Sequence, residues 1–292
     1  MLKYLDTPIF EIAAKEAEIA GLRILVKRED LNHPYVSGNK WWKLKYNLEM
    51  AKKKGQDTLL TFGGAFSNHI YATAAAAKEL GFKSIGVIRG EEVLPVNPTL
   101  AFAKGCGMKL YFVSRTDYKN KSDKSFVERL REELGDFYLI PEGGSNSLAV
   151  RGCSAFAKEK LSTIDFNYLC VATATGGTMA GIIEGFEGKK SVIGFSVLKN
   201  GDFLSDEVRK FLEYSGNEYS NWTIQTDFHF GGYAKQTHEL NQFILKMKQQ
   251  HHLPLDSTYT GKMVAGVFDL MKKNYFARGS TLLLIHTGGL RP

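Results

Sequence analysis

The sequence predicts an α/β fold in which open, twisted, mainly parallel sheets are flanked by helices. Short runs rich in β-branched and aromatic residues alternate with amphipathic or alanine-rich runs along almost the whole chain. This alternation is typical of parallel strands joined by crossover helices. Several strand candidates run directly into glycine-rich turns, where ligands gather in such sheets. The 292 residues suit one large domain or two modest ones.

Eight runs have the length and composition of buried strands. In chain order they are Arg23–Lys27, Thr58–Phe62, Ser84–Ile88, Lys109–Val113, Phe137–Ile140, Tyr168–Thr173, Val192–Val197 and Thr281–Ile285.

Helices are expected between these strands, and three of them are well marked. The run that follows Lys40 carries apolar residues that share one helical face, namely Trp41, Leu44 and Leu48. Asn68–Leu80 is so rich in alanine that we expect it to pack closely on a sheet. Ala234–Gln249 has an apolar stripe at helical spacing, formed by Leu240, Phe243, Ile244 and Met247.

Composition excludes several classes of function. The net charge is +7, but the lysines are scattered rather than gathered with aromatic residues, which favours a small anionic ligand over nucleic acid. The three cysteines and seven histidines have no metal-ligand spacing, so no metal and no disulfide framework are expected. No apolar run reaches the ~20 residues that span a membrane, and the first residues lack the apolar core of a signal peptide. We expect a cytoplasmic protein.

Lys40 is the first candidate for chemistry. It ends the stretch Val36–Lys40 at the start of a predicted helix, and this stretch follows an acidic, irregular loop, Arg28–Tyr35. A lysine fixed at such a junction and screened from water can lose its proton and attack a carbonyl group. The alternative is a solvated charge near a helix start, and the local pattern alone leaves both open.

The segment Thr175-Gly176-Gly177-Thr178 follows a predicted strand and opens a predicted helix. Glycines let a ligand approach the backbone, and the first amides of a helix attract an anion. The two threonine hydroxyls add donors. The pattern predicts a pocket for one phosphate group, because the signatures of nucleotide-triphosphate and dinucleotide sites are missing. The alternative is an ordinary turn between a strand and a helix.

A second glycine-rich turn, Gly63–His69, has the same design with different side chains. Ser67 and Asn68 either cap the alanine-rich helix or expose amides to a carboxylate, and capping does not exclude the second role. Two tyrosines, Tyr233 and Tyr259, also lie close to glycines in predicted loops. Plain packing is a possible role for either.

Seven motifs occur in a fixed order over nearly the whole chain. They are Lys27–Leu31, Ser37–Lys40, Gly63-Gly64 with Ser67–His69, Pro141–Asn146, Thr175–Thr178, Tyr259–Lys262 and His286–Gly289. As a set they resemble the pyridoxal-phosphate enzymes of the tryptophan-synthase-β-like fold, also called fold type II. Within that group the match is to the 1-aminocyclopropane-1-carboxylate deaminase and D-cysteine desulfhydrase family.

The resemblance implies a Schiff base between Lys40 and pyridoxal 5'-phosphate. The phosphate would be held by residues Thr175, Gly176, Gly177 and Thr178. Asn68 would bond the phenolic oxygen of the cofactor. The chain would comprise a large domain of residues 1–52 and 149–292 and a small inserted domain of residues 53–148. A homodimer is usual in the family and is therefore expected.

The resemblance also implies a site for a small amino-acid substrate. Its carboxylate would be received by Ser67, Asn68 and His69, and Lys43 matches a family lysine near that carboxylate. The catalytic residues would be Lys40, Ser67, Tyr233 and Tyr259. One of the two tyrosines would assist the transfer of a proton or a nucleophile.

Two positions bear on the branch of the family. The deaminases carry glutamate directly after the second tyrosine and leucine between the final histidine and the glycine pair, where this chain has Thr260 and Thr287. Hydroxyls at these places resemble the desulfhydrases. A hydroxyl partner leaves the pyridine nitrogen of the cofactor closer to neutral, which suffices when a good leaving group such as sulfide departs.

The chain also departs from the family pattern. Trp41-Trp42 and Ala65-Phe66 replace residues that are commonly smaller or polar, and we expect them to crowd the pocket.

The most specific interpretation is a D-cysteine desulfhydrase that forms pyruvate, hydrogen sulfide and ammonia. The alternatives are 1-aminocyclopropane-1-carboxylate deamination, elimination from D-serine or β-chloroalanine, and a non-catalytic protein that binds a phosphorylated metabolite.

Overall fold

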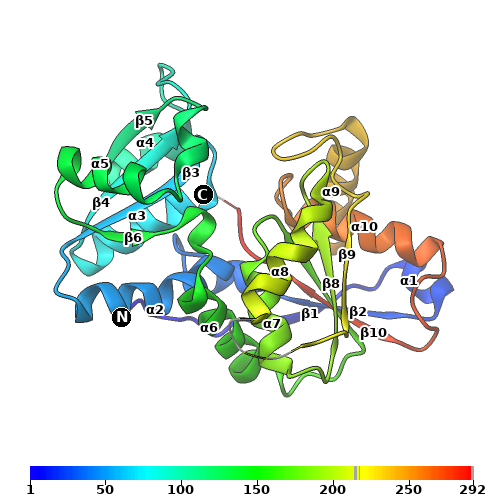
Figure 1. Cartoon of the computed structure of the whole chain (residues 1–292). Helices are drawn as coiled ribbons and strands as arrows, with labels where there is room; N and C mark the ends of the chain where they lie inside the picture. The colour runs from blue at the N-terminus through cyan, green and yellow to red at the C-terminus, as the bar shows by residue number, and fades with distance from the viewer. Residues whose placement is uncertain (214–215, 217, 291–292) are drawn as a thin grey trace.

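The computed structural model describes residues 1–213, 216 and 218–290 of the chain. It has two lobes, each built on its own sheet (Figure 1). The larger sheet has the strand order β1 (Ile9–Glu11), β2 (Arg23–Lys27), β10 (Thr281–Ile285), β7 (Tyr168–Thr173), β8 (Ser191–Ser196) and β9 (Trp222–Gln225). The smaller sheet has the order β5 (Met108–Val113), β4 (Lys83–Arg89), β3 (Thr58–Gly64) and β6 (Tyr138–Ile140).

Strand pairing is parallel throughout both sheets except between β1 and β2. All eight predicted strands are present, and the predicted fold class is confirmed. The sequence prediction missed β1 and β9, which are short strands at the two edges of the larger sheet. Neither is fully buried, so neither has the continuous apolar run of a central strand.

Helices cover both faces of each sheet. Those that flank the larger sheet are α1 (Lys15–Ala20), α2 (Asn39–Lys53), α6 (Ser147–Phe156), α7 (Gly177–Phe186), α8 (Leu204–Glu213), α9 (His238–His251) and α10 (Thr260–Lys272). Those of the smaller lobe are α3 (Asn68–Leu80), α4 (Pro98–Gly105) and α5 (Lys124–Leu134). The predicted helix Ala234–Gln249 begins four residues later, at His238, because Thr237 caps it through the amide of Leu240.

The strands of the larger sheet are buried on both faces. In β10, Leu283 packs with α2, α6 and α7 in one cluster, whereas Leu282 and Leu284 pack with α1 and α10 in another. Neighbouring residues of a strand point to opposite faces, so a continuous apolar run serves both clusters. The first cluster continues into the smaller lobe through the alanines of α3, which confirms the close packing predicted for that helix.

The smaller sheet is formed by strands between residues 58 and 140. The domain limits at residues 53 and 148 stay a prediction. The C-terminal segment leaves β10 and runs back toward the smaller lobe (Figure 1). Within the described part of the chain, no helix has both the length and the apolar character needed to cross a bilayer.

Candidate active site

A cavity of about 600 Å³ is lined by residues of both lobes. Its wall includes the turns that follow β3, β6, β7 and β10. The carboxyl ends of parallel strands are the usual place for ligands in sheets of this kind. All the sequence-predicted site residues lie on this wall except Gly177 and Thr260; those on it are Lys40, Lys43, Ser67, Asn68, His69, Thr175, Gly176, Thr178, Tyr233, Tyr259 and Thr287.

The loop before Lys40 is held by a buried carboxylate. Glu29 is 1% exposed and accepts hydrogen bonds from the side chains of Tyr4, Thr7, Asn32 and Trp42 at 2.6–3.0 Å. Four donors offset the cost of burying one charge. These hydrogen bonds to Glu29 therefore fix the loop that precedes Lys40.

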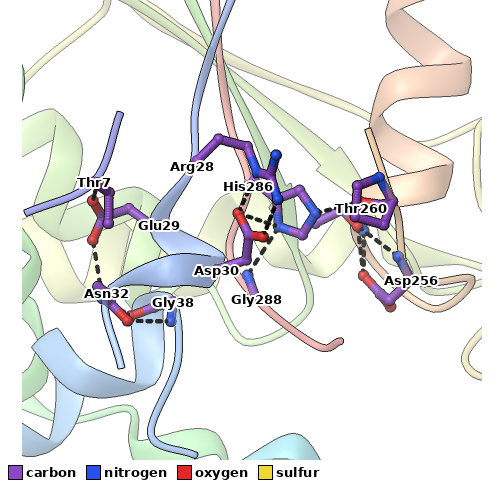
Figure 2. Close-up of polar contacts among 11 residues, drawn as sticks. Thr7, Arg28, Glu29, Asp30, Asn32, Gly38, Asp256, Thr260, His286 and Gly288 are labelled. Atoms are coloured by element: carbon purple, nitrogen blue, oxygen red, sulfur yellow. Dashed lines mark hydrogen bonds and ion pairs between the residues drawn. The ribbon is translucent and has the colours of Figure 1, made fainter. Parts of the chain in front are cut away.

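Asn32 closes this loop onto the start of α2. Its amide group accepts a hydrogen bond from the Gly38 N–H at 2.8 Å and donates to the Gly38 carbonyl at 3.0 Å (Figure 2). Gly38 has a φ of +68°, and a Cβ at this position would overlap the carbonyl oxygen of Thr287. Only glycine permits this contact, which brings the end of β10 against the first turn of α2.

A second buried carboxylate orients the segment after β10. Arg28 donates two hydrogen bonds to Asp30, at 2.8 and 2.7 Å. His286 places Nδ1 3.4 Å from Asp30 Oδ1, while its Nε2 lies 2.8 Å from the carbonyl of Pro254. In Figure 2, Asp30 and His286 lie between Asn32 on one side and Asp256 on the other. These contacts fix the backbone on either side of Thr287.

The two lysines of the cavity lie one helical turn apart. Burial lowers the pKa of Lys40 to about 8, although the charges of Cys153 and Asp256 favour the cation. Burial, and next the charge of Lys40, lowers the pKa of Lys43 to about 7. A lysine that is partly neutral near physiological pH can act as a nucleophile or as a base. The Lys40 amine donates to Asn39 Oδ1 at 3.0 Å, and Asn39 in turn donates to Thr178 at 2.8 Å.

The start of α7 has the features of an anion site. Gly176 has a φ of +74° and begins the helix without a side-chain cap. The Lys43 amine donates to the Ser145 hydroxyl at 2.7 Å, which lies 2.6 Å from the Thr175 hydroxyl. A Cβ on Gly177 would lie only 3.0 Å from Ser145 Oγ. Free helix amides, hydroxyls and one amine form a donor set that fits a phosphate group.

The start of α3 is different because its amides are partly used. Ser67 Oγ accepts from the backbone N–H groups of His69 and Ile70, at 3.2 and 3.3 Å. The capping alternative is therefore confirmed for Ser67, and its hydroxyl proton remains available to a ligand. Asn68 begins the helix beside it and lies on the cavity wall.

His69 is buried and neutral. Burial lowers the pKa of its ring well below 6.5, and the charges of Lys40 and Lys43 lower it further. Its Nε2 lies 2.8 Å from the Thr61 hydroxyl, which donates to the Ile140 carbonyl. Because that hydroxyl has one proton, it accepts from Nε2–H. The side chain of His69 is therefore not a cation for a carboxylate.

The two tyrosines meet at the cavity wall. The Tyr259 hydroxyl donates to the Tyr233 hydroxyl at 3.2 Å, and the rings are edge to face with centroids 6.0 Å apart. Burial raises the pKa of Tyr259 well above its usual value, and Tyr233 and Asp256 raise it further. The Tyr259 phenol is therefore protonated at neutral pH.

Thr260 does not reach the cavity. Its hydroxyl donates to Asp256 Oδ1 at 2.7 Å and accepts from the Asp256 N–H at 3.0 Å. Asp256 also accepts from the backbone N–H groups of residues 258, 259 and 260, each at 2.8 Å. The Thr260 hydroxyl is thus directed to Asp256 and is not on the cavity wall, and direct binding of the cofactor by Thr260 stays a prediction. Thr287 does lie on the wall.

The expected crowding of the pocket is wrong. Trp41 and Trp42 are buried in the hydrophobic core, where they pack with Tyr4 at ring-centroid distances of 5.0 and 5.1 Å. Phe66 is 61% exposed. None of the three is on the cavity wall. For the two tryptophans the reason is that α2 turns one side toward the core and another toward the cavity.

Sequence reasoning did not single out Ser145, Asn39 or Asp256. Ser145 lies in the motif Pro141–Asn146, and its distance from Thr175 in the chain hides their contact. Asp256 could have been anticipated, because aspartate side chains in turns often accept hydrogen bonds from backbone N–H groups a few residues later, as Asp256 does.

Comparison with known protein sequences identifies the family. Residues 1–288 match the family described as pyridoxal-phosphate dependent enzyme. A Pyrococcus horikoshii protein, provisionally named a 1-aminocyclopropane-1-carboxylate deaminase, is 33% identical over 98% of this chain and 90% of its own. An Arabidopsis thaliana protein named bifunctional D-cysteine desulfhydrase/1-aminocyclopropane-1-carboxylate deaminase, mitochondrial, is 30% identical over 92% of this chain and 73% of its own.

Solved structures agree as well. One described as an ACC deaminase homologue has a TM-score of 0.86 and 29% identity, over 99% of this chain and 91% of that one. An O-ureido-L-serine synthase, with a TM-score of 0.73 and 15% identity over 98% of this chain and 90% of that one, shares the fold. The chain therefore belongs to the pyridoxal-phosphate-dependent enzymes, in the family of 1-aminocyclopropane-1-carboxylate deaminases and D-cysteine desulfhydrases, and its cofactor is pyridoxal 5'-phosphate.

Proposed function

We propose that this enzyme catalyses β-elimination from D-cysteine, converting D-cysteine and water to pyruvate, hydrogen sulfide and ammonia. Family membership sets aside the alternative of a non-catalytic binding protein. The expected homodimer and cytoplasmic location stay predictions.

Lys40 would hold the cofactor covalently, and the start of α7 would hold its phosphate. When bound, pyridoxal phosphate supplies an electron sink for the bonds that break at the substrate. We assign Lys43 to the phosphate rather than to the substrate carboxylate, because its amine bonds Ser145 beside Thr175. Ser145 then joins Thr175, Gly176, Gly177 and Thr178 as a phosphate ligand.

The start of α3 would receive the substrate carboxylate. The Ser67 hydroxyl, which accepts from the amides of His69 and Ile70, would donate its own proton to it. Asn68 would bond the phenolic oxygen of the cofactor. His69 would support the Ser67 contact rather than bond the carboxylate itself, since its backbone N–H donates to Ser67 Oγ and its neutral ring donates to Thr61.

Proton transfer falls to Lys40 and the tyrosine pair. The released amine of Lys40, whose pKa burial lowers to about 8, can take the α-proton near neutral pH. Tyr233 and Tyr259 share a hydrogen bond, and burial keeps the Tyr259 phenol protonated, so this pair can give a proton to the departing sulfide. The water that completes the reaction enters after sulfide has left.

The choice of D-cysteine depends on one observation. Each carboxylate on the described part of the cavity wall already has a hydrogen-bond or ion-pair partner in the protein. Glu142 accepts from Tyr118 at 2.8 Å and faces Lys121 at 3.4 Å, and Glu207 accepts from Lys210 at 2.6 Å. Thr287 would therefore bond the pyridine nitrogen through a hydroxyl. That arrangement leaves the nitrogen near neutral, which favours a substrate with a good leaving group over the opening of an unactivated ring.

The test is a product assay on the purified holoenzyme with D-cysteine, L-cysteine, 1-aminocyclopropane-1-carboxylate, D-serine and β-chloroalanine. We expect equal amounts of sulfide and pyruvate from D-cysteine. Formation of 2-oxobutanoate from the cyclopropane substrate, with no sulfide from D-cysteine, would assign the enzyme to the deaminases instead. Lys40→Ala should abolish turnover and the visible absorbance of covalently held cofactor, and a variant that kept that absorbance would exclude Lys40 from this role.

A further inference from the structure

Lys262 is a buried cation that the proposed reaction does not use. It is 0% exposed and lies in the first turn of α10, three residues after Tyr259. Residues at this spacing lie on the same side of a helix. Its amine donates to the Gly232 carbonyl at 2.7 Å, and Gly232 directly precedes Tyr233. The structure therefore joins the two tyrosine segments twice, once through the phenols and once through this lysine.

The Tyr233 turn has an unusual backbone. Four of the residues around the tyrosine have positive φ values, namely Phe230 (48°), Gly231 (90°), Gly232 (111°) and Ala234 (56°). For residues other than glycine the left-handed region costs roughly 1–2 kcal/mol each. Such a conformation persists only where its surroundings hold it in place. Within the turn, the Gly232 carbonyl also accepts from the Lys235 N–H at 3.0 Å.

Burying the ammonium group of Lys262 costs free energy unless a hydrogen bond compensates for the lost water. A buried ammonium group needs partners, and among the described residues the Gly232 carbonyl is the one acceptor that it bonds. Burial lowers the pKa of this amine to about 8, and the charge of Asp256 opposes that shift. Neither the charged nor the neutral amine loses its ability to donate to the carbonyl.

We propose that Lys262 is a positioning residue that holds the Tyr233 turn in its strained conformation and keeps the Tyr233 phenol beside that of Tyr259. The inference rests on the proposed function only in assigning the tyrosine pair a part in the reaction. It differs from a general contribution to stability, because it restricts the effect of Lys262 to one turn and one side chain.

The first test measures the turn itself. Lys262→Met keeps the length of the side chain and removes the donor. In the holoenzyme, hydrogen–deuterium exchange of residues 229–237 should accelerate about tenfold or more in this variant while the sheets keep their protection. Lys246→Met is the matched control, since Lys246 pairs with Glu16 away from the cavity. Unchanged exchange in the turn, or faster exchange throughout the molecule, would overturn the proposal.

The second test is a double-mutant cycle on kcat. If Lys262 acts through Tyr233, then Lys262→Met and Tyr233→Phe each lower kcat, and the double variant is no slower than Tyr233→Phe alone. Losses that multiply would show that the two residues act independently. Should the methionine variant not fold, Lys262→Gln keeps a donor on a shorter stem and should give a smaller loss with the same non-additivity.

The two proposals fail separately. The exchange experiment needs no substrate, so it judges Lys262 even if D-cysteine is not turned over. The cycle uses whichever amino acid the product assay identifies.

Discussion

Two helices at the cavity, α7 and α3, begin in similar sequence contexts, but their first turns are capped differently. Each follows a buried strand and carries a pair of glycines nearby. The first turn of α7 has Gly176 in the capping position and no side-chain cap, and although the Gly177 N–H bonds the Thr175 carbonyl at 2.9 Å, no side chain covers the amides that follow. The first turn of α3 is capped by Ser67, which uses the amides of His69 and Ile70.

The charge beside each helix start differs too. Lys43 lies next to the α7 turn through Ser145, whereas the α3 turn contains His69, whose ring is neutral. An uncapped turn with an amine nearby suits a dianion that stays bound. A capped turn with one free hydroxyl proton suits a monoanion that must leave after each turnover. In the proposed function, the same backbone pattern would thus hold the cofactor phosphate at α7 and bind the exchanging substrate carboxylate at α3.

The largest expected effect comes from removing the amine at the α7 turn. Lys43→Met should weaken binding of pyridoxal phosphate on the order of 10- to 100-fold, because a charge-assisted contact is lost. The KM of the fully loaded enzyme should stay near that of the wild type. Equilibrium titration of the apoprotein with cofactor measures the first quantity, and Lys52→Met, an exposed change on the same helix, is the control. A raised KM with unchanged cofactor affinity would place Lys43 at the carboxylate instead.

The smaller expected effect comes from the cap of α3. Ser67→Ala should raise KM about tenfold, because one hydrogen bond to a charged group is lost, and should lower stability by about 1 kcal/mol as a helix cap disappears. Cofactor affinity should not change. Steady-state kinetics and urea unfolding measure these quantities.

The chain offers a matched control for this change. Asn97 caps α4 in the same manner, through the amides of Thr99 and Leu100, and is not on the cavity wall. Asn97→Ala should lose similar stability and leave KM unchanged. Equal KM values for both variants would mean that Ser67 is only a cap.

The sequence predicted the regular parts of this comparison well. Both glycine-rich turns, the strands before them and the helix Asn68–Leu80 are local patterns, and the structure confirms them. It could not place Lys43, because the partner that fixes its amine, Ser145, is 102 residues away. It also misjudged Trp41 and Trp42, since helical spacing gives a shared face but not which face meets the core. The assignment of Thr260 to the cofactor stays a prediction; its spacing from Tyr259 did not reveal that its hydroxyl bonds Asp256.

The last difference between the two helix starts is in their response to pH. Burial lowers the pKa of Lys43 to about 7 and that of Lys40 to about 8, whereas both lysines titrate near ~10.4 when unfolded. Between these values the unfolded chain holds more protons, so the free energy of unfolding of the apoprotein should rise with pH above about 7.

At the α3 turn, the pH range in which stability changes is lower. The pKa of His69 is well below its unfolded value of about 6.5. The folded state keeps this ring neutral, so its contribution to stability is present above about pH 6.5 and is lost as the pH falls further. Urea unfolding of the apoprotein across the pH range should therefore separate the two regions. Lys43→Met should flatten the rise above pH 7 and, because the charge of Lys43 lowers the pKa of His69, should also make the fall below pH 6.5 smaller. His69→Gln should reduce the fall below pH 6.5 and leave the rise above pH 7 as it is. A change above pH 7 in the His69→Gln variant would contradict the assignment of that rise to the lysines.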